Sequence, residues 1–440
     1  MIALAKQPSR RNSIAVLDGV RAVACLFVVS YHVHYLMSLT YPLASIMTPF
    51  AAAIALSGWS GVTLFFVLSG FLLFMPYAKA VLFEESWPST VKFYLRRALR
   101  ILPGYYVALF ILILLAHREY LQPDHLKLFG VFIALLMDAP ATHLKINGPF
   151  WTLAVEWQYY LVLPWLALLF GLIARGGKTP EQRLLRLLAC LGVMILWGVT
   201  TRYIGRYYFT FHPYDTLLVP RAVMNKFLFY TYGTTGKYYE DFAVGMIVSS
   251  LYIYSRSGSP EHTLTQRLNH ASLWLFGAGL FVLIFMSAWS SVPALRFLRG
   301  FIGEYNWLCE ISYALGYGLC IAGILYGSRR LKWFFERGWL RWLGLISYSL
   351  YVWHIPIFDL FRGAVLKYLP DNFLLDYGLY WLCVLVVTIP FCALVYRFVE
   401  QPWMQLGQQI RERRGSQAAE QQSALEAQPA AEPVTGRLGR

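Results

Sequence analysis

Long apolar segments and short polar loops alternate along the whole chain. Ten of these segments are long enough to cross a bilayer as an α-helix, which takes roughly 20 residues. The predicted spans are residues 14–37, 51–75, 101–117, 150–173, 184–203, 239–256, 271–289, 305–327, 343–366 and 375–398. The pattern therefore predicts an all-α fold, a polytopic transmembrane helix bundle of about ten spans.

Two segments between these spans need separate treatment. Residues 126–138 are apolar but short, and counting them as a span would move the later basic loops to the opposite side of the membrane. We expect them to re-enter the membrane or to lie at its interface. Residues 204–238, rich in Tyr and Phe, form the longest loop expected on the outer side.

Composition and charge agree with a membrane protein. The chain is 58% hydrophobic and 14% charged, whereas a soluble domain carries about 25% charged residues. The net charge is +15, but the basic residues stand in short loops beside apolar segments, a pattern that marks the cytoplasmic side. They are Arg96, Arg97, Arg100, Arg175, Lys178, Arg183, Arg186, Arg329, Arg330, Lys332, Arg411, Arg413 and Arg414. We expect the lipid bilayer, and no nucleic acid, as a partner.

With ten spans, these basic loops share one side of the membrane with both termini, so the N- and C-termini are predicted to be cytoplasmic. Residues 1–13 are then a cytoplasmic N-terminal segment and residues 14–403 a membrane-integral domain. Residues 404–440 are predicted to be a polar, disordered cytoplasmic tail. The six cysteines show no metal-like spacing, so no metal site is expected.

The first span, "LDGVRAVACLFVVSYHVHYL" (residues 17–36), carries charged and ionisable side chains. Each costs about 2.5–3.5 kcal/mol near a bilayer centre, and such groups usually serve function. Arg21 and His32 lie eleven residues apart, which places them on one helical face about 16 Å apart along the axis. One interpretation is a polar stripe lining a cavity, where Arg21 meets an anion and His32 does proton or acyl chemistry. The other is that Asp18 and Arg21 form an interfacial ion pair and His32 hydrogen-bonds a neighbouring helix.

Five further stretches follow this span in a fixed order. They are "GVTLFFVLSGFLL" (61–73), "FYLRRALRILPGYY" (93–106), "FWTLAVEWQYYLVLP" (150–164), "LGLISYSLYVWHIPI" (343–357) and "FVEQPW" (398–403). Together with the first span, they resemble the acyltransferase-3 family of membrane-integral acyltransferases from about residue 14 to 403.

The resemblance implies an enzyme that takes an acyl group, commonly acetyl, from acyl-coenzyme A and delivers it to a hydroxyl, usually on a sugar. The family's arginine–histidine pair matches Arg21 and His32, its Arg-x-x-Arg motif matches Arg97 and Arg100, and its glutamate matches Glu156. The chain departs from the family at Thr63 and Trp157, where acidic residues are frequent. These departures weaken a mechanism that needs carboxylates there.

The residues themselves leave alternatives open. Arg97 and Arg100 lie one helical turn apart and suit a polyphosphate, or they anchor the helix at the cytoplasmic surface. Glu156 either orients His32, binds an acceptor hydroxyl or is solvated at the interface. Ser69 is expected to be a helix-packing position rather than a nucleophile. His354 either lines the same cavity or is a hydrogen-bonded core histidine.

We expect a mechanism in which the arginines bind the donor and His32 takes part in the chemistry. Arg21, Arg97 and Arg100 hold the phosphates of a cytoplasmic acyl-coenzyme A, while the pantetheine arm extends toward His32. His32 then acts as a general base on an acceptor hydroxyl, or accepts the acyl group transiently. The acceptor is an extracytoplasmic or lipid-linked glycan. Because only a polar tail follows residue 403, we expect the membrane domain or a separate partner to complete transfer, without an appended SGNH-type domain.

Two other functions remain possible from the sequence. A polysaccharide or lipid-linked sugar transporter, or flippase, also needs a polar cavity in the membrane. An acyltransferase for a macrolide-like small molecule needs the same donor site. In each case the chain is a multi-pass protein of a cell membrane, with the bacterial plasma membrane as the expected location.

Overall fold

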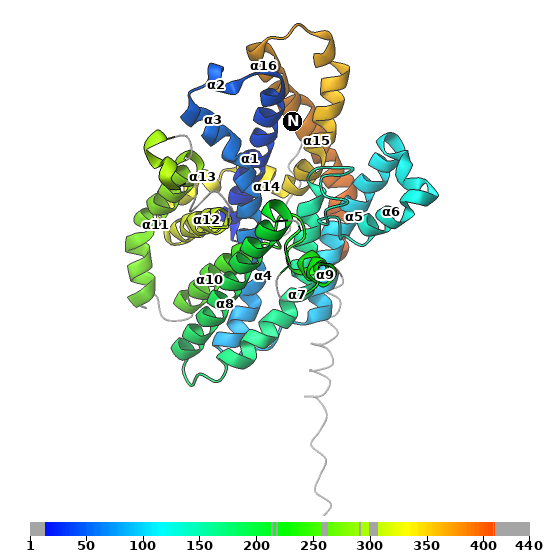
Figure 1. Ribbon diagram of the computed structural model, residues 1–440. Coiled ribbons are helices and arrows are strands. Elements are labelled where there is room, and N and C mark those ends of the chain that lie inside the picture. The colour runs from blue at the N-terminus through cyan, green and yellow to red at the C-terminus, as the bar shows by residue number, and fades with distance from the viewer. Residues whose placement is uncertain are drawn as a thin grey trace, which may run out of the picture.

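A computed structural model describes residues 14–212, 214–216, 219–256, 263–289, 292–298, 307–407 and 409 (Figure 1). These residues form helices and connecting loops, with no β-strand among them. The longer helices are α1 (Ala15–Thr40), α4 (Gly61–Leu82), α5 (Thr90–Ala116), α7 (Phe150–Ala174), α8 (Pro180–Arg206), α10 (Tyr239–Arg256), α11 (Thr263–Ala288), α12 (Cys309–Tyr326) and α15 (Ser347–Ala364). The predicted all-α fold is confirmed.

Shorter helices complete the bundle. They are α2 (Leu43–Ile46), α3 (Pro49–Leu56), α6 (Leu126–Ile133), α9 (Arg221–Thr231), α13 (Arg329–Phe335), α14 (Gly338–Leu345), α16 (Phe373–Cys383) and α17 (Ile389–Val395). Helix α3 leads through a short 3₁₀ turn into α4, and α16 and α17 belong to one helical stretch that reaches Gly407.

Eight helical stretches of the described chain are long and apolar enough to cross a membrane, or nine if α14 and α15 count as one bent span. The chain is therefore a multi-pass membrane protein. The predicted span that is not among these stretches, residues 239–256, does form helix α10. It falls short of a typical apolar span because Glu240, Asp241 and Arg256 lie in its end turns.

The predicted span at 343–366 is not one straight helix. Helices α14 and α15 meet at Ile346 with a bend of 70°. A Cβ atom on Gly344, at the end of α14, would lie 1.8 Å from the backbone oxygen of Asp18 on α1. This contact is close enough to require glycine, and the bend beyond it turns α15 into the bundle.

Local signals in the sequence set where several helices begin. Thr179 accepts a hydrogen bond from the backbone N–H of Gln182, and Pro180 occupies the first turn of α8. Asn372 accepts one from the N–H of Leu375 at the start of α16. Such caps satisfy backbone donors that have no partner within the helix.

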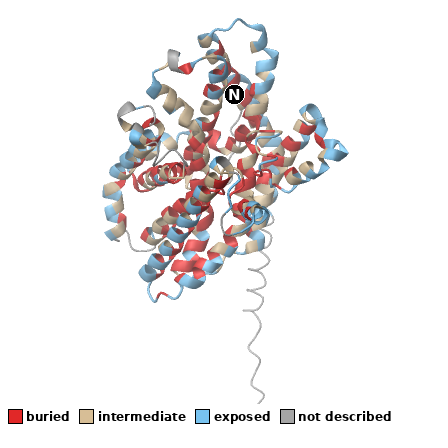
Figure 2. Cartoon of the chain, viewed as in Figure 1, coloured by how far each residue is buried: buried red, intermediate tan, exposed pale blue. Residues whose placement is uncertain are grey.

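The core is formed where α1, α4 and α10 come together in the middle of the bundle. Helix α10 packs against α4 and α8, α11 packs against α12, and α1 packs against α4 and α14. Helix α11 lies at one edge of the bundle and α6 at the other (Figure 1). Buried residues gather along the middle, and exposed ones cover the outer faces and the ends of helices (Figure 2).

One face of α7 is apolar and points outward. Its exposed side chains are Leu161, Trp165, Leu168, Leu169 and Leu172. Their spacing of three and four residues places them on one side of the helix. A lipid-facing helix in a multi-pass protein presents such a surface, because hydrocarbon chains replace water around it.

Two basic residues cap the C-terminal end of α4. Arg175 donates to the backbone oxygen of Ala80, and Arg183 donates to that of Leu82. These carbonyls belong to the last turn of α4, where positive charge is favourable. The basic residues between and at the ends of α7 and α8 thus lie at the same end of the bundle as the last turn of α4.

The segments outside the predicted spans are short helices and turns. Residues 126–138 contain only the eight-residue helix α6, about 12 Å long and too short to cross a bilayer. The predicted loop 204–238 includes the end of α8, a π-helical turn and α9. Helix continues to Gly407, which includes the first residues of the segment predicted as the tail. Residues 1–13 and 410–440 lie outside the described residues.

The close approach at Gly344 gives a first testable prediction. Gly344→Ala should lower the free energy of unfolding by about 1–3 kcal/mol, because the new Cβ must push α14 away from α1. Thermal unfolding of the purified protein in detergent measures this change. Gly338→Ala, in the same helix with no heavy atom within 4 Å of an added Cβ, is the matched control. Equal melting temperatures for the two variants would contradict the tight packing.

Candidate functional site

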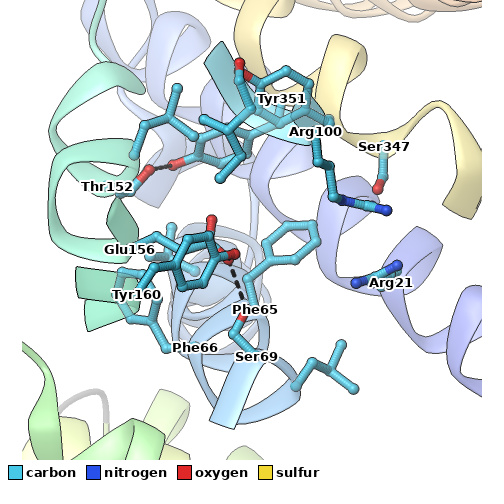
Figure 3. Close-up of a pocket in the computed structure, with 15 residues that line it drawn as sticks. Arg21, Phe65, Phe66, Ser69, Arg100, Thr152, Glu156, Tyr160, Ser347 and Tyr351 are labelled. Carbon is cyan, nitrogen blue, oxygen red and sulfur yellow. Dashed lines mark hydrogen bonds between the residues drawn. The ribbon is translucent and has the colours of Figure 1, made fainter. Parts of the chain in front are cut away.

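A cavity lies in the interior of the bundle (Figure 3). Its volume is about 70 Å³, enough for water molecules but smaller than the roughly 300–1,000 Å³ of a typical ligand pocket. It is lined by Arg21, Val62, Phe65, Phe66, Leu68, Ser69, Arg100, Ile101, Thr152, Leu153, Glu156, Tyr160, Ser347, Tyr348 and Tyr351. Three of the five residues expected from the sequence to form the site, Arg21, Arg100 and Glu156, are thus brought together.

Five elements supply this lining. Helix α1 contributes Arg21, α5 contributes Arg100, α7 contributes Glu156, α4 provides an apolar wall with Ser69, and α15 provides Ser347 and two tyrosines. Figure 3 shows the two arginines on one side of the cavity and Glu156 with Tyr160 on the other. The bend before α15 matters here, because it carries the first turns of that helix to the cavity.

The two arginines of the cavity keep their hydrogen-bonding capacity. Among the described residues, none forms a hydrogen bond or an ion pair with the guanidinium of Arg21 or Arg100. The charge of Arg100 repels that of Arg21. The structure shows no ion pair between Asp18 and Arg21, which was one of the two interpretations of the sequence; an Asp18 carboxyl oxygen lies 4.0 Å from the guanidinium of Arg341 on α14. Two neighbouring cations with free N–H donors form a ready site for an anion.

Glu156 is held by hydroxyl groups of the cavity wall. Its Oε1 accepts a hydrogen bond of 2.7 Å from Ser69 Oγ and a second, short one from the Tyr160 hydroxyl. These contacts bind Glu156 to α4 and to the next turn of α7. No described contact joins it to His32, so the structure does not support the idea that Glu156 orients that histidine.

Ser69 belongs to the site through this hydrogen bond, although we expected it from the sequence to be a helix-packing position. The residues next to Ser69 in the sequence gave no sign of this role, because its partner Glu156 is 87 positions away. Thr152, also on the wall, forms a 2.6 Å hydrogen bond with Tyr351. The polar residues of α4, α7 and α15 therefore form connected pairs around the cavity.

Arg97 lies behind the cavity wall rather than in it. Its guanidinium carbon is 5.9 Å from the centre of the Tyr160 ring, within the range of a cation–π interaction. Its Nε is buried without a hydrogen-bond partner. The structure thus separates the two arginines of the Arg-x-x-Arg motif, because only Arg100 lines the cavity.

His32 also lies outside the cavity lining, and its partner is another histidine. Its Nδ1 is 2.9 Å from the backbone oxygen of Val28 and 3.1 Å from Nε2 of His354 on α15. The ring of His354 is 6.1 Å from that of Tyr351, which lines the cavity. Through Tyr351, the histidine pair therefore adjoins the cavity that holds Arg21.

The "FVEQPW" stretch supplies a further charged residue next to the site. Glu400 is buried and accepts a short hydrogen bond from Ser349 Oγ of α15. Its charge attracts that of Arg100. The sequence placed this motif in the family resemblance but gave it no role, because Arg100 and Glu400 are distant in the chain.

The described residues contain no cluster of three or more His, Cys, Asp or Glu side chains that could hold a metal ion. All six cysteines are buried thiols.

A buried polar network joins Gln158 of α7, two residues after Glu156, to Asp138 and Lys237. Lys237 forms a short ion pair with Asp138 and donates a 2.8 Å hydrogen bond to Gln158 Oε1. Gln158 in turn donates to the second oxygen of Asp138, and Thr234 donates to the Asp138 backbone oxygen. The network thereby ties the loops before α7 and before α10 to the helix that carries Glu156.

The chain matches one protein family and several curated proteins. Residues 14–397 match the family model of the acyltransferase-3 proteins, described as an acyltransferase domain. The peptidoglycan O-acetyltransferase OatA of Listeria monocytogenes is 25% identical over 420 residues, 89% of this chain and 56% of the relative. The putative peptidoglycan O-acetyltransferase YrhL of Bacillus subtilis is 24% identical over 412 residues, 88% of this chain and 54% of the relative.

A putative O-acetyltransferase of Staphylococcus aureus (strain COL) is 24% identical over 416 residues, 89% of this chain and 57% of the relative. The chain therefore spans little more than half the length of these curated relatives. No solved structure matches the chain.

The Asp138–Lys237 pair gives a prediction about stability. Lys237→Met should cost about 3–5 kcal/mol, because it leaves the buried Asp138 carboxylate without its cation. The free energy of unfolding in detergent checks this value. Arg362→Met is the matched control, since Arg362 and Asp359 form an exposed pair at 3.8 Å that should contribute about 0–1 kcal/mol. The network has no anchoring role if both substitutions have the same effect.

Proposed function

This chain belongs to the acyltransferase-3 family, and from that premise we propose that it transfers an acyl group from acyl-coenzyme A to a hydroxyl group of a glycan. The acyl group is acetyl, and the acceptor is an extracytoplasmic or lipid-linked glycan of the bacterial envelope. Residues 14–397 form an acyltransferase domain, and the chain is a multi-pass membrane protein. The relatives are bacterial and two carry peptidoglycan in their names, which supports the plasma membrane as location and a cell-envelope glycan as acceptor.

One observation carries this proposal. Arg21 and Arg100 face one cavity with free donors, and a histidine pair adjoins the same cavity through Tyr351. A transferase needs an anion-binding site for its polyphosphate donor and a base near the reacting carbonyl. The family membership favours transfer over the transport function that the sequence left open.

The donor is bound by positive charge. Arg21 and Arg100 offer planar guanidinium groups that bind phosphate oxygens in pairs, and Arg97 adds a third charge behind them. The pantetheine arm of acyl-coenzyme A is long enough to cover the distance of about 16 Å that separates Arg21 from His32 along α1. Because the cavity has a volume of only about 70 Å³, donor binding requires the helices around it to separate.

His32 is the base in this proposal. It removes the proton from the acceptor hydroxyl, whose oxygen attacks the thioester carbonyl. The carbon–oxygen bond forms, the carbon–sulfur bond breaks, and the proton passes from His32 to the coenzyme A thiolate. In the second route, His32 attacks the thioester itself and carries the acyl group to the hydroxyl. Both routes consume one acyl-coenzyme A and release one coenzyme A.

Glu156 is assigned to the acceptor. Its carboxylate already accepts hydrogen bonds from two hydroxyl groups, those of Ser69 and Tyr160. A sugar hydroxyl other than the one that His32 deprotonates would replace the Ser69 contact and be held by the same carboxylate. No metal ion takes part in these steps.

The role of His32 is tested by substitution. His32→Ala should lower transfer about 10²–10⁴-fold, the usual contribution of a general base, while the amount of protein in the membrane stays normal. Coenzyme A release by the full-length protein in lipid vesicles, with acetyl-coenzyme A and glycan fragments, measures the rate. His34→Gln is the control on the same helix, because His34 contacts Tyr377 away from the cavity. Wild-type rates in His32→Ala would remove His32 from the mechanism.

The arginines are tested through donor affinity. Arg21→Ala and Arg100→Ala should each weaken acetyl-coenzyme A binding roughly 10–150-fold, since hydrogen bonds to charged groups are worth about 1.5–3 kcal/mol. Arg97→Ala should have a smaller effect, because its guanidinium lies on Tyr160 outside the cavity. Isothermal titration with acetyl-coenzyme A measures the dissociation constants. Lys92→Ala, an exposed position on the same helix, is the control, and equal affinities in all four variants would speak for membrane anchoring.

A further inference from the structure

Two histidines from opposite parts of the chain meet inside the bundle. His32 lies on α1 and His354 on α15, 322 positions later. The ring of His354 is completely buried, whereas that of His32 is partly exposed. Nε2 of His354 and Nδ1 of His32 are 3.1 Å apart, a hydrogen-bond distance. One of these two nitrogens must therefore carry a hydrogen and the other a lone pair.

The backbone decides the tautomer of His354. Its Nδ1 is 3.0 Å from the carbonyl oxygen of Leu350, four residues earlier in the same helix. A carbonyl oxygen only accepts hydrogen bonds, so this nitrogen must be the one that carries hydrogen. In a neutral imidazole the other nitrogen, Nε2, then bears the lone pair.

The same argument applies to His32. Its Nδ1 is 2.9 Å from the carbonyl oxygen of Val28, also four residues earlier. A lone pair there would face a carbonyl oxygen at close range, whereas an N–H donates to it. That N–H also points to Nε2 of His354, whose lone pair receives it. Every distance is satisfied when both rings are protonated at Nδ1.

We infer that His354 is a positioning residue that holds His32 in the Nδ1–H tautomer and thereby presents Nε2 of His32 as the basic nitrogen. This inference rests on the proposed function, since it specifies which atom of His32 reacts. It holds for both routes above, because Nε2 is the atom that takes either the proton or the acyl group. A base oriented by a third group is a common arrangement in acyl-transfer enzymes.

The proton balance fits this arrangement. When Nε2 takes the proton of the acceptor hydroxyl, His32 becomes an imidazolium with an N–H at each nitrogen. Its Nδ1–H remains bonded to Nε2 of His354, so the positive charge keeps a hydrogen-bond acceptor inside the membrane. When Nε2 returns the proton to the coenzyme A thiolate, the starting tautomer is restored.

Packing keeps His354 in place for this role. Its ring contacts those of Tyr351 and Phe358 at 6.1 and 5.9 Å between centres. No water reaches the buried Nε2, so its lone pair depends on His32 for a partner. Since unpaired buried polar atoms are costly, the two histidines fix each other, and Tyr351 joins them to the cavity.

The tautomer can be observed directly. The full-length protein labelled with ¹⁵N-histidine in lipid vesicles should show His32 with a protonated Nδ1 and a non-protonated Nε2 at neutral pH. The His32→Ala spectrum assigns these signals. A spectrum with hydrogen on Nε2 of His32 would overturn the inference, whatever the outcome of the activity tests.

Substitutions of His354 give the second test. His354→Leu removes the acceptor and should lower kcat roughly 10–100-fold, as loss of a supporting hydrogen bond often does, with an unchanged KM for acetyl-coenzyme A. His354→Gln places an amide oxygen near the position of Nε2 and should restore most of kcat. Thermal unfolding of both variants checks the fold.

The outcomes separate the two proposals. If His32→Ala abolishes transfer but His354→Leu keeps wild-type kcat, the positioning role is wrong and the proposed function stands. If Leu and Gln at position 354 lower kcat equally while both variants stay folded, the hydrogen bond is not what matters, and the positioning role is again wrong. If His32→Ala is fully active, the role of His32 as base or acyl carrier is wrong although the chain transfers the acyl group, and the ¹⁵N spectrum alone decides the tautomer.

Discussion

A polar side chain in the apolar interior of the bundle costs several kcal/mol unless a partner there satisfies it. Arg202 shows how this requirement is met. It binds Glu240 through an Nε–Oε1 distance of 2.7 Å, donates to the Thr235 backbone oxygen at 2.6 Å and lies 4.5 Å from the centre of the Tyr238 ring. Lys237 is satisfied in the same way by Asp138 and Gln158. Arg21 and Arg100 differ from these residues, because both line the cavity and no described residue gives either guanidinium a hydrogen bond or an ion pair. A bound anion would supply the hydrogen-bond acceptors that the described residues do not provide.

Helix packing places these charges where they are needed. Gly344 lets α14 approach the backbone of α1 at Asp18, three residues before Arg21. The bend of 70° that follows turns α15 inward, so that its first turns reach the cavity and its later part carries His354 to His32. The same helix thus contributes part of the cavity wall and the hydrogen-bond partner of His32. A straight helix leaving α14 would carry these residues in another direction.

Two connected sets of polar groups in and beside the cavity enter the proposed mechanism. Glu156 with Ser69 and Tyr160 forms one, on the side of the cavity opposite the arginines. The two histidines form the other, and Tyr351 contacts both regions through its place in the cavity wall and its neighbour His354. Donor binding and proton transfer are therefore assigned to adjoining but separate groups. In the proposed mechanism, the arginines then bind phosphate without placing a positive charge directly against His32, which would oppose its protonation.

The sequence by itself determined the helices, because an apolar segment of sufficient length in a membrane protein has to be helical to satisfy its backbone. It also placed Arg21 and His32 on one face of α1, since helical periodicity is a local property. The family resemblance indicated Arg100 and Glu156, and both line the cavity. Only the tertiary structure showed that Arg97 lies behind the wall, that Glu156 binds Ser69, and that the partner of His32 is His354. These contacts join residues between 63 and 322 positions apart, and the angles at which helices cross decide them. The bend between α14 and α15 was not predicted for the same reason. It lies where α14 packs closely against α1 at Gly344, and no local sequence pattern predicts that contact.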